Sequence, residues 1–424
     1  MNKVKQTADE AKILRVGYVV PGWPLKHFPN GIVTYVQNIL LGLDAITKPI
    51  LFASALVGDE ADDKLVALNK INNNHQLLQR LIVAVLYRLN FGLAKKTLYK
   101  LMMMDNALKL HLAIQALKVP LDILEIDESF GTASQLVKMN TVPIVTRIHG
   151  PWLMMPPITK ANANWDYQYR VFYEGQAIAN AHGVTAPSLD VLQKVRQFYG
   201  LSLPNARVIP NPVPTVAIDK QWVLNLDKPP TILFVGRFDL LKGGDLILDA
   251  FRQIALSHPT IELLFVGPDG GINVDGKTLR FNAYIERFIP ESSIKQRIQF
   301  FGHCDSLAIA ELRRQSLITV VCSRYEAFSL SLVEALATGC PTVATAVGGM
   351  KEIIINEYNG LLAEPESVAS IVGKILELIS DPEKMQTLSK NAIEDCKKRF
   401  APEAVAAQTV AYYKTILSAQ AAVQ

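Results

Sequence analysis

Two glutamates, Glu326 and Glu334, stand with seven residues between them where a strand pattern gives way to a helix pattern. The apolar run Leu317 to Cys322 predicts a buried strand, Glu326 falls in the loop that follows it, and Glu334 falls in the next helix. A glutamate in a loop or a helix is most often solvated surface, but both follow the carboxyl end of a predicted strand, where ligands bind in open parallel sheets. The first N–H groups of the helix, around Leu330 and Ser331, have no partner inside the helix and can bind an anion. The segment therefore predicts a polar binding site with an anion beside it.

A second group of residues, which could bind an anion, follows another apolar run. Arg237 comes directly after Gly236, which ends the predicted strand, and Lys242 stands five residues further on. Arginine offers a planar fork of donors and lysine a compact point charge. Two fixed cations and helix-terminal amides can neutralise the charge of a departing diphosphate without a metal. The alternative is a surface loop with two unrelated cations.

Apolar strand patterns alternate with helix patterns along the whole chain. Near-continuous apolar strands separated by helices predict parallel sheets that are covered on both faces. The predicted strands of the first half are Ile13 to Val20, Leu121 to Ile126, Pro143 to Ile148 and Gly183 to Ala186, and those of the second half are Thr231 to Val235, Ile261 to Val266, Gln299 to Phe301, Leu317 to Cys322 and Pro341 to Ala344.

The length of 424 residues favours two α/β domains. The break falls in a proline-rich stretch with no helix or strand period, Asn211 to Pro230. We expect two doubly wound, Rossmann-like domains that face a central cleft, with a last helix, Glu403 to Leu417, returning to the first domain. The predicted parts are residues 1–211, a linker at 212–230, residues 231–400, and residues 401–424.

Composition narrows the function classes. Hydrophobic residues make up 50% and charged residues 19%, which argues against disorder, and a net charge of +4 does not suggest a nucleic-acid coat. The cysteines, Cys304, Cys322, Cys340 and Cys396, lack metal-ligand spacing, and a reducing cytoplasm fits them. Residues 1–12 lack the pattern of a secretory signal, and uncharged runs do not reach transmembrane length. We expect a cytoplasmic protein.

Residues 75–118 differ from their surroundings, because an apolar stripe at helical spacing is accompanied by seven lysines and arginines. One interpretation is a pair of covering helices with a solvated basic face. The other is a surface that meets anionic lipid or a lipid-linked acceptor, peripheral to the inner face of a membrane.

Four segments of the second half resemble glycosyltransferase family 4, which has the two-domain GT-B fold. They read FVGRFDLLKGGD, FVGPDG, SRYEAFSLSLVEALATGCPTVATAVGGMKEII and NGLLAEPE, in the order that the family shows. The first half is similar more loosely, through PNGIVTYVQNIL, TRIHGPW and VIPNPV. The resemblance covers nearly all of the second predicted domain and implies a retaining, hexosyltransferase-like enzyme that uses a nucleotide sugar. It implies that residues 1–211 form the acceptor-binding domain and residues 231–400 the nucleotide-sugar-binding domain.

The resemblance also implies roles for single residues. Arg237 and Lys242 would bind the donor diphosphate, Glu326 the hydroxyls of the transferred sugar, and Glu334 the ribose. His149 would face the sugar from the other domain, so that the implied catalytic residues are Arg237, Lys242, Glu326 and His149. The implied donor site comprises Gly31, Gly236, Arg237, Lys242, Gly267, His303, Glu326, Ala327, Phe328, Ser329, Leu330 and Glu334.

Two positions depart from the family pattern. Asn30 precedes Gly31 where many relatives have paired glycines, and Ser329 stands where glycine is frequent. The amide contact at Gly31 is the one that the first departure affects, whereas a backbone contact at Ser329 would survive the change.

The expected reaction uses neither metal nor cofactor, takes a uridine diphosphate sugar by default, and joins the sugar to a saccharide or lipid-linked acceptor in glycan, polysaccharide or glycolipid synthesis. Three alternatives remain open. One is a metal-dependent GT-A transferase, whose nearest candidate element is Glu125-Ile126-Asp127. The others are a sugar-nucleotide epimerase of the GT-B type and a two-lobed protein that binds a solute without chemistry.

Overall fold

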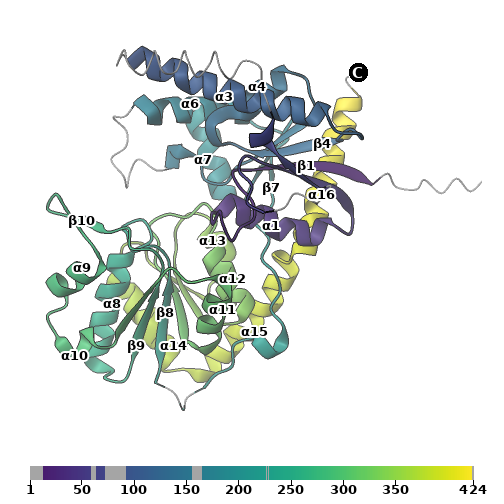
Figure 1. Cartoon of the computed structure of the whole chain (residues 1–424). Helices are drawn as coiled ribbons and strands as arrows, with labels where there is room; N and C mark the ends of the chain where they lie inside the picture. Colours follow the sequence, from purple (N-terminus) through teal and green to yellow (C-terminus); the bar gives the residue numbers. More distant parts are fainter. Residues whose placement is uncertain are drawn as a thin grey trace, which may run out of the picture. The chain divides into compact units, whose positions relative to one another are not determined.

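Two parallel β-sheets organise the chain, and helices alternate with their strands (Figure 1). The computed structural model describes residues 13–58, 64–71, 92–154, 165–225, 227 and 229–422, with side chains from residue 99 in the helix that starts at Gly92 and from residue 167 in the helix that starts at Trp165. Residues group into two compact units. The first comprises Met1–Arg147, Tyr169–Val184 and Ala406–Gln424, and the second comprises Ile148–Gln168 and Thr185–Val405.

The first sheet has seven strands in the order β3-β2-β1-β4-β5-β6-β7. Its neighbouring strands run parallel, so each connection must cross over the sheet, mostly through a helix. The strands are β1 (Leu14–Val20), β2 (Thr47–Ala53), β3 (Leu65–Ala67), β4 (Ile123–Asp127), β5 (Ile144–Arg147), β6 (Gly183–Ala186) and β7 (Arg207–Val208). The helices that accompany them are α1 (Gly31–Leu43), η1 (Leu68–Lys70), α3 (Gly92–Gln115), η2 (Ser129–Gly131), α4 (Thr132–Lys138), η3 (Trp152–Met154), α6 (Trp165–Asn180) and α7 (Leu189–Tyr199).

The second sheet has six parallel strands in the order β12-β9-β8-β13-β14-β15. They are β8 (Thr231–Val235), β9 (Glu262–Val266), β12 (Ile298–Gly302), β13 (Ile318–Val321), β14 (Thr342–Thr345) and β15 (Leu361–Ala363), beside a small hairpin of β10 (Ile272–Val274) and β11 (Lys277–Leu279). The helices are η5 (Ile218–Lys220), α8 (Gly244–Ser257), α9 (Phe281–Phe288), α10 (Ser292–Lys295), α11 (Ser306–Gln315), α12 (Leu330–Thr338), α13 (Met350–Ile353), α14 (Val368–Ile379) and α15 (Pro382–Arg399). α16 (Pro402–Ala421) follows them.

The core of the second sheet shows why β8 is apolar from Ile232 to Val235. Ile232 and Phe234 pack into the cluster that contains α8 and α14, whereas Leu233 packs on the opposite face with Leu264. Successive side chains of a strand point to opposite faces, so a strand covered on both sides has no position for a polar residue. Packing on both faces therefore stabilises the sheet whose strand ends carry the site.

Strand order reverses once in each sheet, between β1 and β4 in the first and between β8 and β13 in the second. At such a reversal the connections leave the two adjacent strands in opposite directions and open a crevice at their carboxyl ends, where ligands bind in doubly wound folds. Binding sites are therefore expected at these two reversals.

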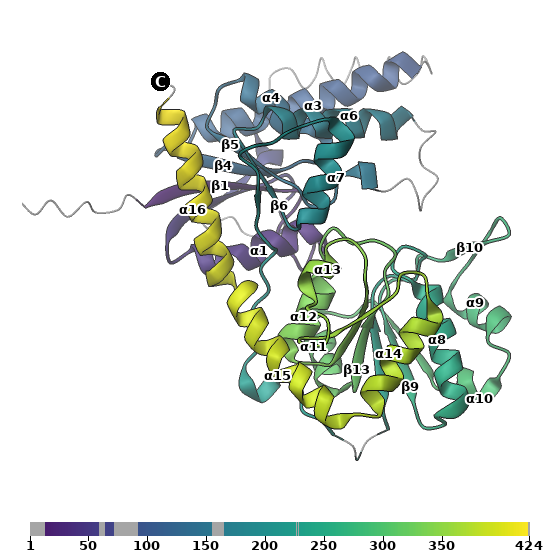
Figure 2. The same ribbon diagram turned by 180° about the vertical axis from the view of Figure 1, so that it is seen from behind.

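A buried carboxylate joins the C-terminal helix to the first unit. Glu125, on β4, is 3% exposed and accepts hydrogen bonds from the hydroxyls of Tyr35 (2.7 Å) and Tyr413 (2.8 Å). The hydroxyl of Tyr18 lies 3.0 Å from that of Tyr413. Figure 2 shows α16, in yellow, beside β1 and β4. Burial raises the pKa of Glu125, although the charge of Arg147 and the two tyrosine hydroxyls oppose this effect.

We expect Glu125 to make the protein less stable as pH rises above the ordinary glutamate pKa of about 4.5. A carboxyl with a raised native pKa holds its proton more tightly when folded, so its stabilisation is complete below the unfolded value and is lost up to the native value. If the folded protein binds this proton ten times more tightly than the unfolded chain does, the difference contributes about 1.4 kcal/mol to the free energy of unfolding. Urea unfolding of the wild type and Glu125→Gln between pH 4 and 8 should show the free energy of unfolding falling more steeply in the wild type, and parallel profiles would contradict this.

The predicted strands are confirmed, each within two residues at either end. Strands β2, β3, β7 and β15 and the β10–β11 hairpin were not predicted. The helix expected at Glu403 to Leu417 is α16, which begins one residue earlier and extends to Ala421.

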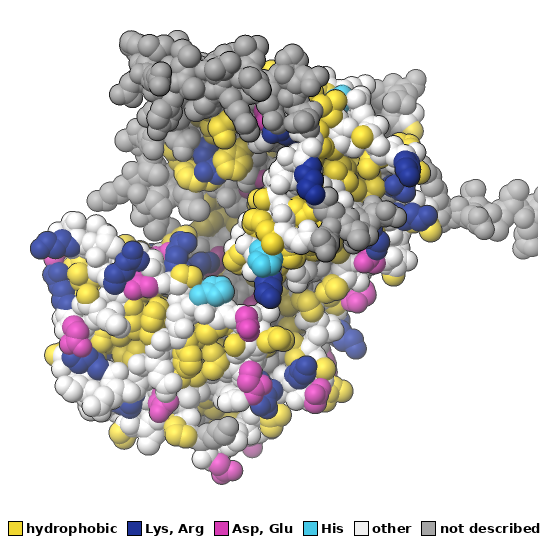
Figure 3. Space-filling model, in the orientation of Figure 1, with side chains coloured by type: hydrophobic (Ala, Val, Ile, Leu, Met, Phe, Trp, Pro, Cys, Tyr) yellow, Lys and Arg dark blue, Asp and Glu magenta, His cyan; other side chains and the backbone are white. Residues whose placement is uncertain are grey.

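The basic stretch at 75–118 falls largely outside the described residues, since the description resumes at Gly92. In the described part, Lys109 is paired with Asp105 at 2.6 Å. On the face drawn in Figure 3, basic and acidic side chains are interspersed over the second unit. Among the described helices, none combines the length and apolar character needed to cross a bilayer. Contact with a membrane surface stays a prediction.

Candidate functional site

The reversal between β8 and β13 brings two predicted segments of the second unit together. Arg237 to Lys242 follows β8, and Ser323 to Ser329 follows β13. The N–H of Arg324 donates to the carbonyl of Leu241 at 2.8 Å, which joins the two loops through their backbones. Residues that are far apart in sequence thus form one site.

Lys242 and Glu326 are in direct contact at the centre of this site. The Nζ of Lys242 lies 2.5 Å from Oε1 of Glu326, and the hydroxyl of Ser323 donates to the same oxygen at 2.9 Å. The Glu326 side chain is 12% exposed and that of Lys242 33% exposed. A charge-assisted bond at this level of burial orients both groups.

Asp239 organises the two cations. It pairs with Nε of Arg237, and its Oδ1 accepts from the N–H of Lys242 at 2.8 Å. The Arg237 side chain is 53% exposed, so its remaining donors face solvent. The loop therefore holds one exposed guanidinium and one anchored ammonium near the same strand end.

Glycines allow the strand ends to approach each other. At Gly267, where φ is +143°, an added Cβ would lie 2.0 Å from the carbonyl oxygen of Gly236. Only glycine adopts this backbone conformation readily, and only glycine fits the space. The predicted donor-site residues Gly236 and Gly267 thus meet in a close backbone approach, which keeps side chains away from the end of β8.

A second pair of glycines supports Glu326 from behind. The N–H of Gly349 donates to the carbonyl of Glu326 at 2.9 Å, and a Cβ on Gly348 would lie 2.1 Å from the same oxygen. Gly348 has a φ of +49°. The backbone of Glu326 is therefore held against this pair.

The neighbours of Glu326 are fixed as well. Arg324 forms a two-pronged ion pair with Asp245, with distances of 2.8 and 2.6 Å, which raises the pKa of Arg324. The hydroxyl of Tyr325 donates to Asp190 at 3.1 Å, and burial raises the pKa of Tyr325. The loop is thus restrained before any ligand binds.

The start of α12 lies next along the chain. Ser329 is its N-cap, and its hydroxyl accepts from the N–H of Leu332 at 3.4 Å. Phe328 packs against the cluster that contains Phe400. The amides of Leu330 and Ser331 precede the first intrahelical bond and can serve an anion.

Glu334 has a partner of its own. Its Oε2 lies 2.8 Å from Nη1 of Arg313, a residue of α11 whose side chain is only 4% exposed. Arg313 also donates to the hydroxyl of Ser331 at 3.1 Å. The structure thus gives the two predicted carboxylates different cations, with Glu326 on Lys242 and Glu334 on Arg313.

Replacing Glu334 by glutamine should raise the Michaelis constant for the donor and leave turnover nearly unchanged. Loss of binding that is equal in ground and transition states has this signature. Glutamine is preferable to alanine, because it keeps a hydrogen-bond acceptor for the buried guanidinium of Arg313, whereas truncation would remove that partner and destabilise the protein further. Initial rates at varied donor concentration test this, with Glu311→Gln, which loses an exposed pair to Arg314, as the control. A fall in turnover alone would contradict the assignment.

Of the remaining predicted residues, Gly31, His149 and His303 lie outside the two loops, and Ala327 lies within the second. Gly31 is the first residue of α1, and a Cβ added there meets nothing within 4 Å, so packing inside the described chain does not require glycine. His149 follows β5 by two residues and is partly buried, and His303 follows β12 and is exposed. Ala327, whose carbonyl accepts from Ser188 at 2.7 Å, continues the loop from Glu326. The roles of these residues stay predictions.

Arg313, Asp239 and Ser323 were missed in the sequence. Arg313 precedes Arg314 on a helix and reads as part of a solvated basic face. The Gly348-Gly349 pair after a buried strand was a usable signal, since glycine there marks close backbone approach.

The metal-site candidate Glu125-Ile126-Asp127 does not fit a metal. Glu125 is occupied by Tyr35 and Tyr413, and Asp127 accepts from the N–H of Ser129 at 2.8 Å. In the part of the chain that the structure describes, groups of three or more His, Cys, Asp or Glu with metal-binding geometry are absent.

Relatives share about half of their length with this chain. An uncharacterized glycosyltransferase from Methanocaldococcus jannaschii is 36% identical over 166 residues, which are 39% of this chain and 43% of that protein. A D-inositol 3-phosphate glycosyltransferase from Segniliparus rotundus is 26% identical over 255 residues, or 58% of this chain and 55% of that protein.

Solved structures show the fold over nearly the whole chain. Sucrose-phosphate synthase from Thermosynechococcus elongatus aligns with a TM-score of 0.69 at 21% identity, covering 96% of this chain and 100% of that one. Anabaena HepE, in complex with UDP and glucose, aligns with a TM-score of 0.64 at 16% identity, covering 95% and 100%.

Two family matches divide the sequence between them. Residues 29–216 match the family described as Glycosyltransferase Family 4, and residues 217–395 match Glycosyl transferases group 1. Since the two matches together run from residue 29 to residue 395, through most of both halves, the chain belongs to glycosyltransferase family 4.

Proposed function

We propose that this protein is a glycosyltransferase that moves a sugar from a nucleoside-diphosphate sugar to a hydroxyl acceptor, with retention of anomeric configuration. The observation that carries the proposal is the contact of Lys242 with Glu326 at 2.5 Å, at the strand-order reversal of the second sheet. Arg237 stands on the same loop as Lys242. The pair suits the bond between sugar and phosphate. The carboxylate can bind the sugar on one side of that bond, and the cation that it holds in place can contact the phosphate on the other side.

The proposed reaction passes through attack on the face from which the phosphate leaves. The bond between the anomeric carbon and the phosphate oxygen breaks, the acceptor hydroxyl bonds to the same carbon, and its proton passes to the departing phosphate oxygen. Lys242 and Arg237 stabilise the negative charge that develops on that oxygen. Glu326 binds sugar hydroxyls, and its anchoring by Lys242 and Ser323 supports a positioning role over that of a nucleophile.

Uridine diphosphate is the first nucleotide to test. The UDP complexes of Anabaena HepE support this choice, since that protein shares the fold. We propose that no metal is required, because Arg237, Lys242 and the amides at the start of α12 supply the positive charge. The free cysteines, of which Cys322, Cys340 and Cys396 are buried, suit a reducing compartment such as the cytoplasm.

The deciding experiment measures nucleoside diphosphate release from UDP-, GDP- and ADP-sugars, with and without added saccharide and lipid-linked acceptors. We expect release that depends on acceptor and persists in EDTA, and a product whose anomeric configuration by NMR equals that of the donor. Conversion of the donor sugar without acceptor would instead indicate an epimerase. Binding without release would indicate a solute-binding protein, and inhibition by EDTA would contradict the metal-independent mechanism.

A further inference from the structure

One buried cation of the second unit contacts two parts of the proposed donor site at once. Arg313, on α11, has a side chain that is 4% exposed, and its Nη1 lies 2.8 Å from Oε2 of Glu334. Its Nη2 donates to the carbonyl of Ser331 at 3.3 Å and to the hydroxyl of Ser331 at 3.1 Å. Both partners belong to α12, which packs beside α11 (Figures 1 and 2). The guanidinium therefore holds the predicted ribose-binding carboxylate relative to the first turn of α12, whose amides can bind a phosphate.

Ser331 extends this network to the end of β8. Its hydroxyl accepts from Arg313 and donates to the carbonyl of Val235 at 3.2 Å, and a hydroxyl can do both at once. Val235 is the last residue of β8 and stands two residues before Arg237. Arg313 is thus connected, through Ser331, to the strand end that carries the predicted diphosphate-binding cation.

Stability alone does not favour an arginine at this position. The charge of Arg313 is removed from water, and its Nε is buried without a hydrogen-bond partner among the residues that the structure describes. A buried donor that is left unpaired lowers stability, and apolar side chains of similar volume often pack as well as a buried ion pair or better. A role in ligand binding explains the arginine better than packing does.

Electrostatics point to such a role. Glu334 would bind the ribose of a nucleotide whose diphosphate is also negatively charged, and like charges repel each other. Arg313 compensates the charge of Glu334 at 2.8 Å, so that the carboxylate can lie beside an anion at a lower cost. The Glu334 side chain is 37% exposed, so water screens part of its charge and the effect should be moderate in size.

We infer that Arg313 is a positioning residue that allows ribose and diphosphate to bind in one site. It holds Glu334 and the start of α12 at a fixed spacing, and its charge prevents Glu334 from repelling the diphosphate. The inference rests on the proposed function and adds to it a residue that determines the preference for a diphosphate over less charged ligands.

Binding of UDP, UMP and uridine to the full-length protein tests this charge dependence. Calorimetry and competition NMR measure the affinities, and thermal unfolding of each variant checks the fold. We expect Arg313→Met to weaken UDP about tenfold or more, UMP less, and uridine about threefold or less, because repulsion from an uncompensated Glu334 grows with the charge of the ligand. If the nucleotide-sugar panel identifies guanosine or adenosine as the base, the corresponding three ligands take their place.

Three further variants separate charge from fold. Arg314→Met is the matched control, since Arg314 is the next residue of α11 and forms an exposed pair with Glu311 at 2.5 Å. It should change each of the three affinities less than about twofold. Arg313→Gln is a second neutral variant that retains hydrogen-bond donors, and it should show the same order of losses. Arg313→Lys keeps the charge and should keep the ratio of UDP to uridine affinity within about threefold of the wild type.

The double variant, Arg313→Met with Glu334→Gln, should bind UDP more tightly than Arg313→Met does, because it lacks the uncompensated carboxylate. An equal loss for all three ligands, or no recovery in the double variant, would overturn the inference, since a structural role alone has these signatures. Equal UDP affinities in Arg313→Met and Arg314→Met would overturn it as well. In these cases a wild type that binds UDP and transfers sugar leaves the proposed function standing, whereas a wild type that binds no nucleoside diphosphate would overturn both.

Discussion

Replacing Lys242 by alanine is expected to lower turnover about a hundredfold or more. Loss of one preorganised donor to a developing oxyanion typically has this effect. In this protein the loss also releases Glu326, whose Oε1 lies 2.5 Å from the lysine, so the carboxylate that we propose to bind the sugar would lose one of its anchors at the same time. Steady-state kinetics with the donor identified from the nucleotide-sugar panel measure the effect.

A matched control tests whether turnover falls because Lys242 itself is lost or because any paired lysine is lost. Lys384→Ala also breaks an ion pair, with Glu377 at 2.5 Å, but on α15 and away from the strand ends. That variant should keep turnover within about twofold of the wild type, because single surface pairs contribute little. Unchanged turnover in Lys242→Ala, with an unchanged thermal midpoint, would refute the role given to Lys242.

Replacing Gly348 by alanine is expected to reduce turnover about tenfold or more without touching a ligand-binding side chain. The new Cβ would lie 2.1 Å from the carbonyl oxygen of Glu326, at a φ of +49° that alanine tolerates poorly. The loop must shift, and a displacement of about 1 Å at a reacting centre can cost about a hundredfold in rate. Thermal unfolding should show a modest loss of stability, about 1–3 kcal/mol.

Gly373→Ala provides the comparison for this change. Gly373 lies in α14, where an added Cβ meets nothing within 4 Å. Alanine should there be neutral or slightly stabilising, since it favours the helix. If Gly348→Ala behaves like Gly373→Ala in rate and stability, then the glycine pair does not position Glu326.

The apolar strands were predictable because burial on both faces leaves an unmistakable run of Val, Ile and Leu. Strand β2 escaped prediction because Lys48 and Pro49 interrupt its pattern near the start. Strands β3 and β15 have three residues each, too few for any period to show. Short strands depend on the neighbours with which they pair, and this dependence leaves no local trace in the sequence.

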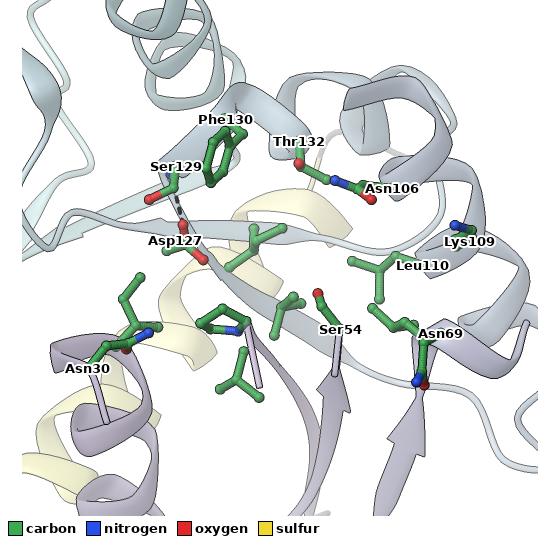
Figure 4. Close-up of a pocket in the computed structure, with 16 residues that line it drawn as sticks. Asn30, Ser54, Asn69, Asn106, Lys109, Leu110, Asp127, Ser129, Phe130 and Thr132 are labelled. Atoms are coloured by element: carbon green, nitrogen blue, oxygen red, sulfur yellow. Dashed lines mark hydrogen bonds between the residues drawn. The ribbon is translucent and has the colours of Figure 1, made fainter. Parts of the chain in front are cut away.

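The site residues that belong to one continuous sequence segment were predictable, because their spacing is visible in that segment. Arg237, Lys242, Glu326 and Glu334 each belong to a recognisable segment, and the contact of Lys242 with Glu326 follows from the adjacent ends of β8 and β13. The pairing of Glu334 with Arg313 could not be predicted, because it depends on how α11 and α12 pack. A cavity at the ends of β1 and β4 (Figure 4) was equally hidden, since its lining comes from segments spread between Val19 and Thr132.

The way in which the two units are distributed along the sequence determines the order in which they are completed during synthesis on the ribosome. The second unit holds all of its residues once Val405 has been made, but the first unit includes the stretch that begins at Ala406. Until that stretch emerges, Glu125 lacks the hydroxyl of Tyr413, and the backbone of Val184 lacks the hydroxyl of Tyr412, which bonds to its N–H at 2.8 Å. The unit that is synthesised first is therefore the one that is completed last.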